Sequence, residues 1–160
     1  MDPIQFLEQV VRPNVEEQRN DISNLRKAIN ALAAVDSLAA HLFVWQIENS
    51  VEALQGIDDD VAYREQLSGR QSDFRLVRDV SKAIKHVRLT RGSPEASSAT
   101  QIQTRSLGWD EAHWGEGRWG SPPQVVVETN SGDLRVVETI IENALAFLMK
   151  EMAEVGLVTN

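Results

Sequence analysis

The sequence contains no cysteine. Disulfide bonds, thiolate metal sites, iron–sulfur clusters and cysteine nucleophiles are therefore all excluded. Histidine is also scarce, because only His41, His86 and His113 are present. A histidine-based metal site would need carboxylate ligands in addition. We predict neither a metal centre nor a bound cofactor.

Long hydrophobic runs are missing as well. The start, Met1-Asp2-Pro3, lacks the basic segment and apolar stretch of a signal peptide. The most apolar stretch, residues 31–47, is interrupted by polar side chains such as Asp36 and His41. It is too short and too polar to span a bilayer and is typical of a buried helix. We expect a cytoplasmic protein without a membrane segment.

Acidic residues outnumber basic ones, 24 to 16, which gives a net charge of −8 at pH 7. This balance favours solubility and disfavours nonspecific binding to nucleic acid or anionic lipid, although a local basic patch can override it. The 160 residues, 42% of them hydrophobic, are enough to form a core. We predict one domain over residues 1–160.

Apolar residues recur at three- and four-residue spacing in five segments, which predicts five helices. Four are long and one is short. We expect them at about 4–19, with a kink or an end at Pro13, at 22–54, at 61–67 (the short one), at 74–89 with Ser72 or Asp73 as the cap, and at 137–152 with Gly156 after the end.

Residues 92–133 have a different character. A small, polar loop at 92–98 precedes a possible strand at 100–107, and the most strand-like segment is 125–129. A turn at 130–133 precedes a short second strand at 134–136. The predicted fold is mainly α: an antiparallel bundle of four main helices plus a short one, with a small antiparallel hairpin or sheet inserted at 92–133 before the last helix.

Asp36 is an unusual residue, because it lies within the apolar stripe of the predicted central helix. A carboxylate buried there needs a partner or a raised pKa. Two structural alternatives remain. The helix breaks near Val35 with Asp36 as the cap of a second helix, or Asp36 pairs with a basic side chain of a neighbouring helix.

The helix at 74–89 has a strongly polar arc. Such an arc can bind an anion, or supply a histidine acid or base beside cationic groups. Alternatively, it is a solvated face with internal pairs between Arg75 and Asp79 and between Asp79 and Lys82. We expect the opposite, apolar arc to face the core and the polar arc to stay outside. The polar arc contains Arg75, Arg78, Asp79, Lys82 and His86.

Arg78-Asp79 followed by His86 on a late helix of a small bundle resembles the arginine–polar–histidine signature of the HEPN superfamily. That superfamily includes RNase toxins and nucleotide-binding modules, and its members often act as dimers with the motif at the shared interface. The resemblance implies an active pair of Arg78 and His86, assisted by Asp79 and Lys82. Seven residues separate Arg78 from His86, where the family pattern has four to six.

The segment 108–123 contains three of the four tryptophans among glycines and charged residues. Such a loop can stack sugars or bases, or bind a partner peptide. Asp110, Glu111 and His113 offer a weak site for a hard cation. The alternative is that the tryptophans pack on the bundle or in a dimer contact. The candidate ligand or partner residues are Trp109, His113, Trp114 and Trp119.

No nucleophile elbow, P-loop, zinc-protease motif, EF-hand loop or dinucleotide fingerprint occurs in the sequence. We therefore expect an interaction or regulatory protein that forms a homodimer and has a possible protein partner, and we leave open whether it is an enzyme. The alternative is a HEPN-like ribonuclease or nucleotide-binding protein that uses Arg78 and His86. Only that alternative implies RNA or a nucleotide as partner.

Overall fold

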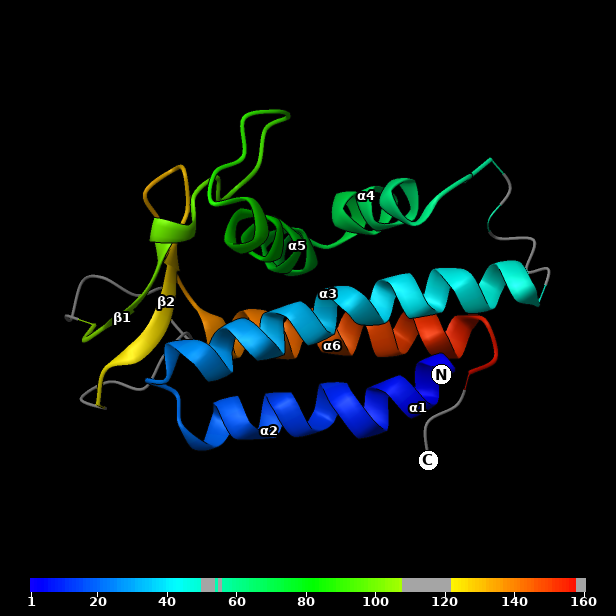
Figure 1. Cartoon of the computed structure of the whole chain (residues 1–160), viewed down its shortest axis with the longest axis horizontal. Helices are drawn as coiled ribbons and strands as arrows, with labels where there is room; N and C mark the ends of the chain where they lie inside the picture. Colours follow the sequence, from blue (N-terminus) through cyan, green and yellow to red (C-terminus); the bar gives the residue numbers. More distant parts are fainter. Residues whose placement is uncertain (50–53, 55, 108–121, 158–160) are drawn as a thin grey trace.

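The computed structural model describes residues 1–49, 54, 56–107 and 122–157. The fold is mainly helical, with a three-stranded antiparallel sheet before the last helix, as predicted (Figure 1). The elements are α1 (Pro3–Phe6), a π-helical segment (Leu7–Val11), α2 (Arg12–Asn20), α3 (Leu25–Glu48), α4 (Asp60–Arg70), α5 (Ser72–His86), a 3-10 turn (Ala99–Gln101), β1 (Ile102–Arg105), β2 (Gln124–Glu128), β3 (Leu134–Val136) and α6 (Val137–Glu154).

Residues 3–20 form one helical rod rather than two helices. Asp2 caps the start and Pro3 occupies the first turn. The segment Leu7–Val11, just before Pro13, has π-helical hydrogen bonding. A proline lacks an N–H and its ring clashes with the carbonyl one turn earlier, so the looser π turn lets the chain continue. The helix therefore continues through Pro13 without ending.

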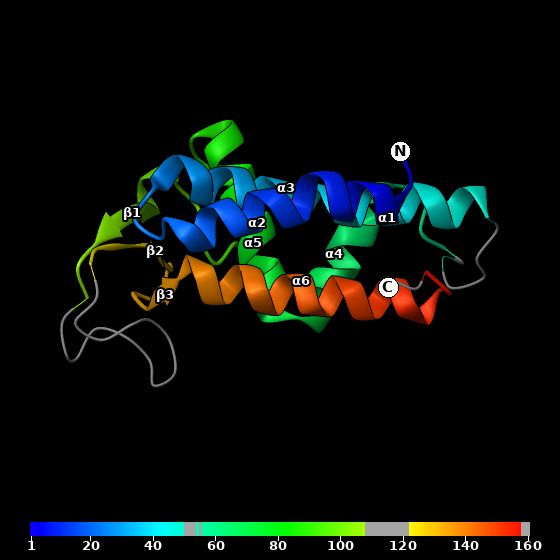
Figure 2. The same ribbon diagram turned by 90° about the horizontal axis from the view of Figure 1, so that it is seen from below.

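Helix α3 is the central element of the fold. It runs beside α2 on one face of the molecule and contacts α6, α5 and α4 on its other sides (Figures 1 and 2). Asn24 caps its start by accepting the Lys27 N–H. The helix is unbroken through Asp36, so the predicted break near Val35 is wrong. It ends at Glu48, six residues earlier than predicted.

Helices α4 and α5 follow each other with a short break at Gln71. Helix α4 runs from Asp60 to Arg70 and so passes through Ser68 and Gly69, where we predicted its end. The cap of α5 is the Gln71 side chain, which accepts the Phe74 N–H, and not Ser72 or Asp73 as predicted. Helix α5 ends at His86, three residues early.

The sheet has the strand order β1-β2-β3 and packs against the start of α3. Ile102 pairs with Val127, and Val126 pairs with Val136. The Val125 N–H donates to the Ile22 carbonyl at 2.8 Å, which fixes the sheet to the turn before α3. Strand β1 is shorter than predicted because Ala99–Gln101 forms a 3-10 turn capped by Ser98.

Helix α6 agrees closely with the prediction. It runs from Val137 to Glu154, and Gly156 follows in the left-handed conformation at φ 86°. Its apolar stripe, which includes Ile140, Ala144 and Leu148, is fully buried. Each buried leucine or isoleucine stabilises the fold by roughly 1.5–3 kcal/mol.

One helix of the described chain, α3, is long and apolar enough to cross a membrane by length and composition alone. More than half of that stretch is buried inside the protein. The core helix of a soluble protein and a signal sequence near the N-terminus pass the same test. Helix α3 contacts α2, α4, α5 and α6. Asp36 in its middle pairs with Arg64 of α4 at 2.8 Å.

Candidate functional site

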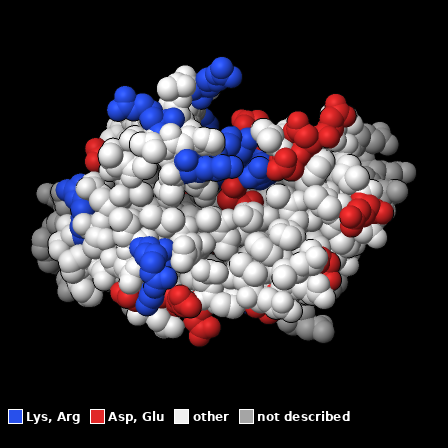
Figure 3. Space-filling view, in the orientation of Figure 1, with Lys and Arg blue, Asp and Glu red and all other residues white. Residues whose placement is uncertain are grey.

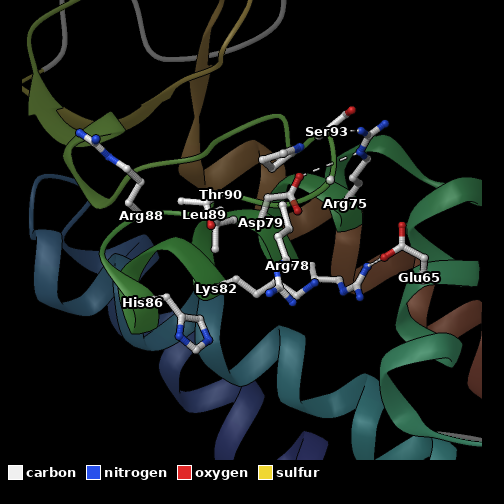
Figure 4. A pocket seen from close by; sticks show the side chains of 13 residues that line it. Glu65, Arg75, Arg78, Asp79, Lys82, His86, Arg88, Leu89, Thr90 and Ser93 are labelled. Atoms are coloured by element: carbon white, nitrogen blue, oxygen red, sulfur yellow. Dashed lines mark hydrogen bonds and ion pairs between the residues drawn. The ribbon is translucent and has the colours of Figure 1, made fainter.

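A polar pocket of about 710 Å³ lies on α5, between α4 and the loop after α5 (Figure 4). Helix α5 supplies Arg75, Arg78, Asp79, Lys82 and His86, which are all five residues of the predicted polar arc. The remaining lining residues come from outside α5 and are Glu65 of α4 and residues 88–94 of the loop.

Positive charge predominates in this pocket. The pocket is lined by two carboxylates, Glu65 and Asp79, and by five cationic side chains, although the net charge of the protein is −8. Figure 3 shows the basic side chains gathered over α5 and the following loop, with acidic side chains beside them over α4. The five cationic residues are Arg75, Arg78, Lys82, Arg88 and Arg91.

Arg78 is buried, with 3% of its side chain exposed. Its guanidinium forms an ion pair with Glu65 of α4 and donates to the Val61 carbonyl at 3.3 Å. The Nε of Arg78 is buried and has no partner among the described residues. The contact with Arg78 lowers the pKa of the Glu65 carboxyl. Arg78 therefore joins α4 to α5 and offers only part of its charge to the pocket.

Asp79 holds the loop against α5. Its Oδ2 accepts the Glu95 N–H at 2.8 Å and lies 4.0 Å from Nε of Arg75. Burial raises the pKa of the Asp79 carboxyl, and the Glu95 N–H and Arg75 act in the opposite direction. Arg75 in turn donates to the Ser93 carbonyl at 2.5 Å. The predicted pair of Arg75 and Asp79 is thus present at the limit of ion-pair distance.

Lys82 is a half-buried cation in the wall of the pocket. In the part of the chain that the structure describes, no carboxylate lies within 4.0 Å of its amino group, so the predicted pair with Asp79 is not formed as an ion pair. Burial and the neighbouring Arg78 lower the pKa of the Lys82 amine. Figure 4 shows Lys82 and Arg78 side by side, with the His86 ring pointing away from them.

The loop wall of the pocket begins with a strained residue. Val87 follows His86 with φ 66°, a conformation that β-branched residues avoid and that costs roughly 1–3 kcal/mol. The Val87 carbonyl accepts the Ala99 N–H at 3.0 Å, and the Leu89 N–H donates to the Ser97 carbonyl at 2.7 Å. These bonds fold residues 87–99 back on themselves and bring Arg88 and Arg91 to the pocket.

The polar arc of α5 is not the solvated face that we predicted. Arg78 and Asp79 are buried, Arg75 and Lys82 are half-buried, and only His86 is exposed. The apolar arc is buried as predicted, since Val80 is 3% exposed. Both arcs are covered because α4 and the loop at 92–97 pack on the polar side. Their packing could not be inferred from the periodicity of α5 alone.

Asp36 lies behind this pocket on α3. It pairs with Arg64, which also binds Asp60 at 2.5 Å, so the predicted pairing with a neighbouring helix is confirmed. The Oδ1 of Asp36 is buried without a partner among the described residues, and burial raises the pKa of this carboxyl. Arg78 and Lys82 oppose that shift electrostatically. Asp36 therefore serves the packing of α3 against α4 and α5.

The remaining candidates are four residues of the segment 108–123 and His41, which does not line the pocket. Trp109, His113, Trp114 and Trp119 lie outside the described residues. His41 stacks on Phe6 with ring centroids 3.9 Å apart. No group of three metal-ligating side chains occurs within residues 1–49, 54, 56–107 and 122–157.

Sequence reasoning missed Glu65, Arg88 and Arg91 as pocket residues. The basic, glycine-containing segment 88–92 carried a signal in its composition, since Arg88 and Arg91 directly follow the polar helix. Glu65 carried none, because an acidic residue on a short amphipathic helix is ordinary. Only the packing of α4 on α5 brings it to Arg78.

Comparison of the chain with protein-family models, with curated proteins and with solved structures finds no match.

Proposed function

We propose that this protein is a binding or regulatory protein whose pocket on α5 takes a small, phosphate-bearing ligand. The observation that carries the proposal is the excess of cationic side chains in one pocket of an acidic protein. Lys82 in particular is half-buried and lacks an ion-pair partner among the described residues. Bringing a cation there without a partner costs free energy that a bound anion would offset.

The kind of anion follows from the donors. Guanidinium groups form paired hydrogen bonds with phosphate, and an ammonium group adds a compact charge. Five cationic groups against two carboxylates leave an excess of three, which one carboxylate ligand would not neutralise. A ligand with two or three linked phosphates matches them better, either as free oligophosphate or as the phosphate part of a nucleotide.

The size of the ligand follows from the surroundings. The basic side chains are confined to one pocket of about 710 Å³, within the usual range for small-molecule sites. No Phe, Tyr or Trp of the described chain lines it, so the pocket offers no platform for stacked bases. The net charge of −8 repels a long phosphate backbone. These features favour a compact ligand over a nucleic-acid strand.

Calorimetric titration with pyrophosphate, tripolyphosphate and ATP at two salt concentrations tests the proposal. We expect binding that weakens as salt rises, and an affinity at least about tenfold lower for Lys82→Gln, equal to roughly 1.4 kcal/mol. Lys85→Gln is the matched control, because Lys85 lies exposed on the same helix and does not line the pocket. Absence of binding to all three ligands, or equal losses in both variants, contradicts the proposal.

The second candidate is the HEPN-like ribonuclease. The observation in its favour is that Arg78, Asp79, Lys82 and His86 all line the same pocket. Against it stand the contacts of Arg78 with Glu65 and the exposed position of His86. An RNA-cleavage assay separates the two candidates. Cleavage by the wild type that His86→Ala and Arg78→Ala both abolish supports the ribonuclease, whereas equal activity in all three, or none, rejects it.

A further inference from the structure

The outward face of α3 carries a stripe without charge. Figure 3 shows a broad uncharged area across this face of the molecule, along α3. Large apolar side chains lie within the stripe, since Val44 is 50% and Ile47 is 51% exposed. Towards the N-terminal end of α3, the side chains of the stripe are small or polar. Its exposed or half-buried members are Asn30, Ala33, Ser37, Ala40, His41, Val44 and Ile47.

A single charge of opposite sign lies at each end of this stripe. Arg26 is exposed in the first turn of α3, and Glu48 is exposed at its last residue. Neither forms a salt bridge or side-chain hydrogen bond within the part of the chain that the structure describes, whereas Lys27, beside Arg26, pairs with Asp21. The α3 residues of the stripe are therefore uncharged between Arg26 and Glu48, which lie at its two limits. Met1 and Asp2 line a hollow beside its C-terminal half, together with Ala40, His41, Val44 and Glu48.

The two charges are placed symmetrically about Ser37. Each lies eleven residues from it, which is about three turns, so both remain within about 20° of its direction on the helix. When two such helices pack antiparallel about a twofold axis at Ser37, residue 37 − n of one faces residue 37 + n of the other. Arg26 then faces Glu48 of the partner subunit, and the partner's Arg26 faces Glu48.

We propose that two copies of this chain associate through the α3 stripe, antiparallel about Ser37. A twofold interface must be complementary to itself, and this stripe meets that condition in charge. Ala33, Ser37 and Ala40 near the axis let two helices approach to about 8 Å. Val44 is then removed from water against the other copy. A crossing angle near 20° keeps the two ends, about 16 Å from the axis, within reach of arginine and glutamate.

This choice of occupant rests on the charges. A membrane or an apolar peptide would bury Val44 and Ile47 but would give Arg26 and Glu48 no counterpart. A second copy supplies both. The α3 stripe is also separate from the pocket, which lies on α5 and the following loop. The association therefore does not depend on the proposed ligand.

Sedimentation velocity over a wide range of protein concentration tests the proposal by charge exchange. The wild type is expected to be dimeric at high concentration. Arg26→Glu and Glu48→Arg each place like charges together twice, and should raise the dimer dissociation constant at least about tenfold. The double variant Arg26→Glu/Glu48→Arg restores opposite charges and should return to within about threefold of the wild type. Circular dichroism checks that each variant folds.

Two controls complete the experiment. Lys150→Glu changes an exposed charge on α6 by the same amount and should leave dimerisation unchanged. Val44→Arg places a charge inside the stripe and should give monomers. A monomeric wild type at every concentration overturns the proposal, as does a double variant no better than the single ones. Flotation of monomeric protein with phosphatidylcholine vesicles would assign the stripe to a membrane instead.

Discussion

Charged side chains near the start of α5 are arranged differently from those further along the helix. At the N-terminal end, Asp73 is buried and accepts hydrogen bonds from Arg135 and Asn143, each at 2.8 Å. These donors come from β3 and α6, so one carboxylate holds three elements together. Further along, Arg78 and Lys82 border an open pocket in which cations exceed carboxylates.

The two regions differ in how far their positive and negative side chains are paired with one another. In the Asp73 cluster, both carboxylate oxygens accept hydrogen bonds. In the pocket, Lys82 has no carboxylate beside it among the described residues, and the space next to it is open. Paired buried charges maintain the fold, whereas an unbalanced and accessible set is suited to bind a ligand. The following predictions test that contrast.

The largest effect is expected from Asp73→Ala. Removing the carboxylate deletes the hydrogen bonds that Arg135 and Asn143 donate to it and should lower the free energy of unfolding by about 2–3 kcal/mol. Urea denaturation measures it. Oligophosphate affinity should be unchanged where the variant is folded. Glu154→Ala is the control, because its pair with Lys150 is exposed and should contribute less than about 0.5 kcal/mol. Equal losses in both variants would show that Asp73 is not a structural centre.

A smaller effect is expected from Glu65→Gln. The Glu65 side chain is 73% exposed and its charge opposes that of an incoming phosphate, while glutamine can still accept from Arg78. The affinity for tripolyphosphate should rise about two- to fivefold by calorimetry. Glu17→Gln changes the net charge equally but lies on α2, and should leave the affinity unchanged. Weaker binding by Glu65→Gln would mean that Glu65 supports the ligand rather than competing with it.

The smallest effect is expected from Asp36→Asn, under about 1 kcal/mol, because Arg64 keeps its bond to Asp60. The effect of Asp36→Asn on stability is expected to depend on pH. Burial raises the pKa of Asp36 above 3.8, so the folded state holds this proton more tightly than the unfolded state. The stability that Asp36 contributes is present below pH 3.8 and is lost as pH rises through the folded pKa.

The wild type should therefore lose stability relative to Asp36→Asn as pH increases across that interval, in denaturation curves recorded at several pH values. A difference between the two proteins that does not vary with pH would show that burial does not govern this carboxyl.

Local patterns predicted most of the helices and strands. Helix α6 was predicted closely because its apolar stripe and the terminal Gly156 agree. The ends of α5 were predicted less well. A glutamine cap at Gln71 is not a usual signal, and a valine at positive φ is not predictable from propensity. Both depend on contacts with elements distant in the sequence.

The candidate site was predicted only in part, again because contacts between segments distant in the sequence decide its structure. The spacing of residues along α5 places Arg75, Arg78, Asp79, Lys82 and His86 on one arc, and the structure places all five at one pocket. Whether the arc is exposed to solvent or buried depends on the packing of α4 and of the loop at 92–97. The spacing of residues along α5 does not predict the packing of either segment.

The sequence by itself determined the helical character of the chain, the position of the sheet and the polar arc of α5, since these follow from local periodicity and turn chemistry. Only the tertiary structure decided that Arg78 is paired with Glu65, that Asp36 is held by Arg64 and that the loop at 87–99 closes over Asp79. The reason is physical: the partner that neutralises a buried charge is chosen by helix packing in space, and spacing along the chain does not record it.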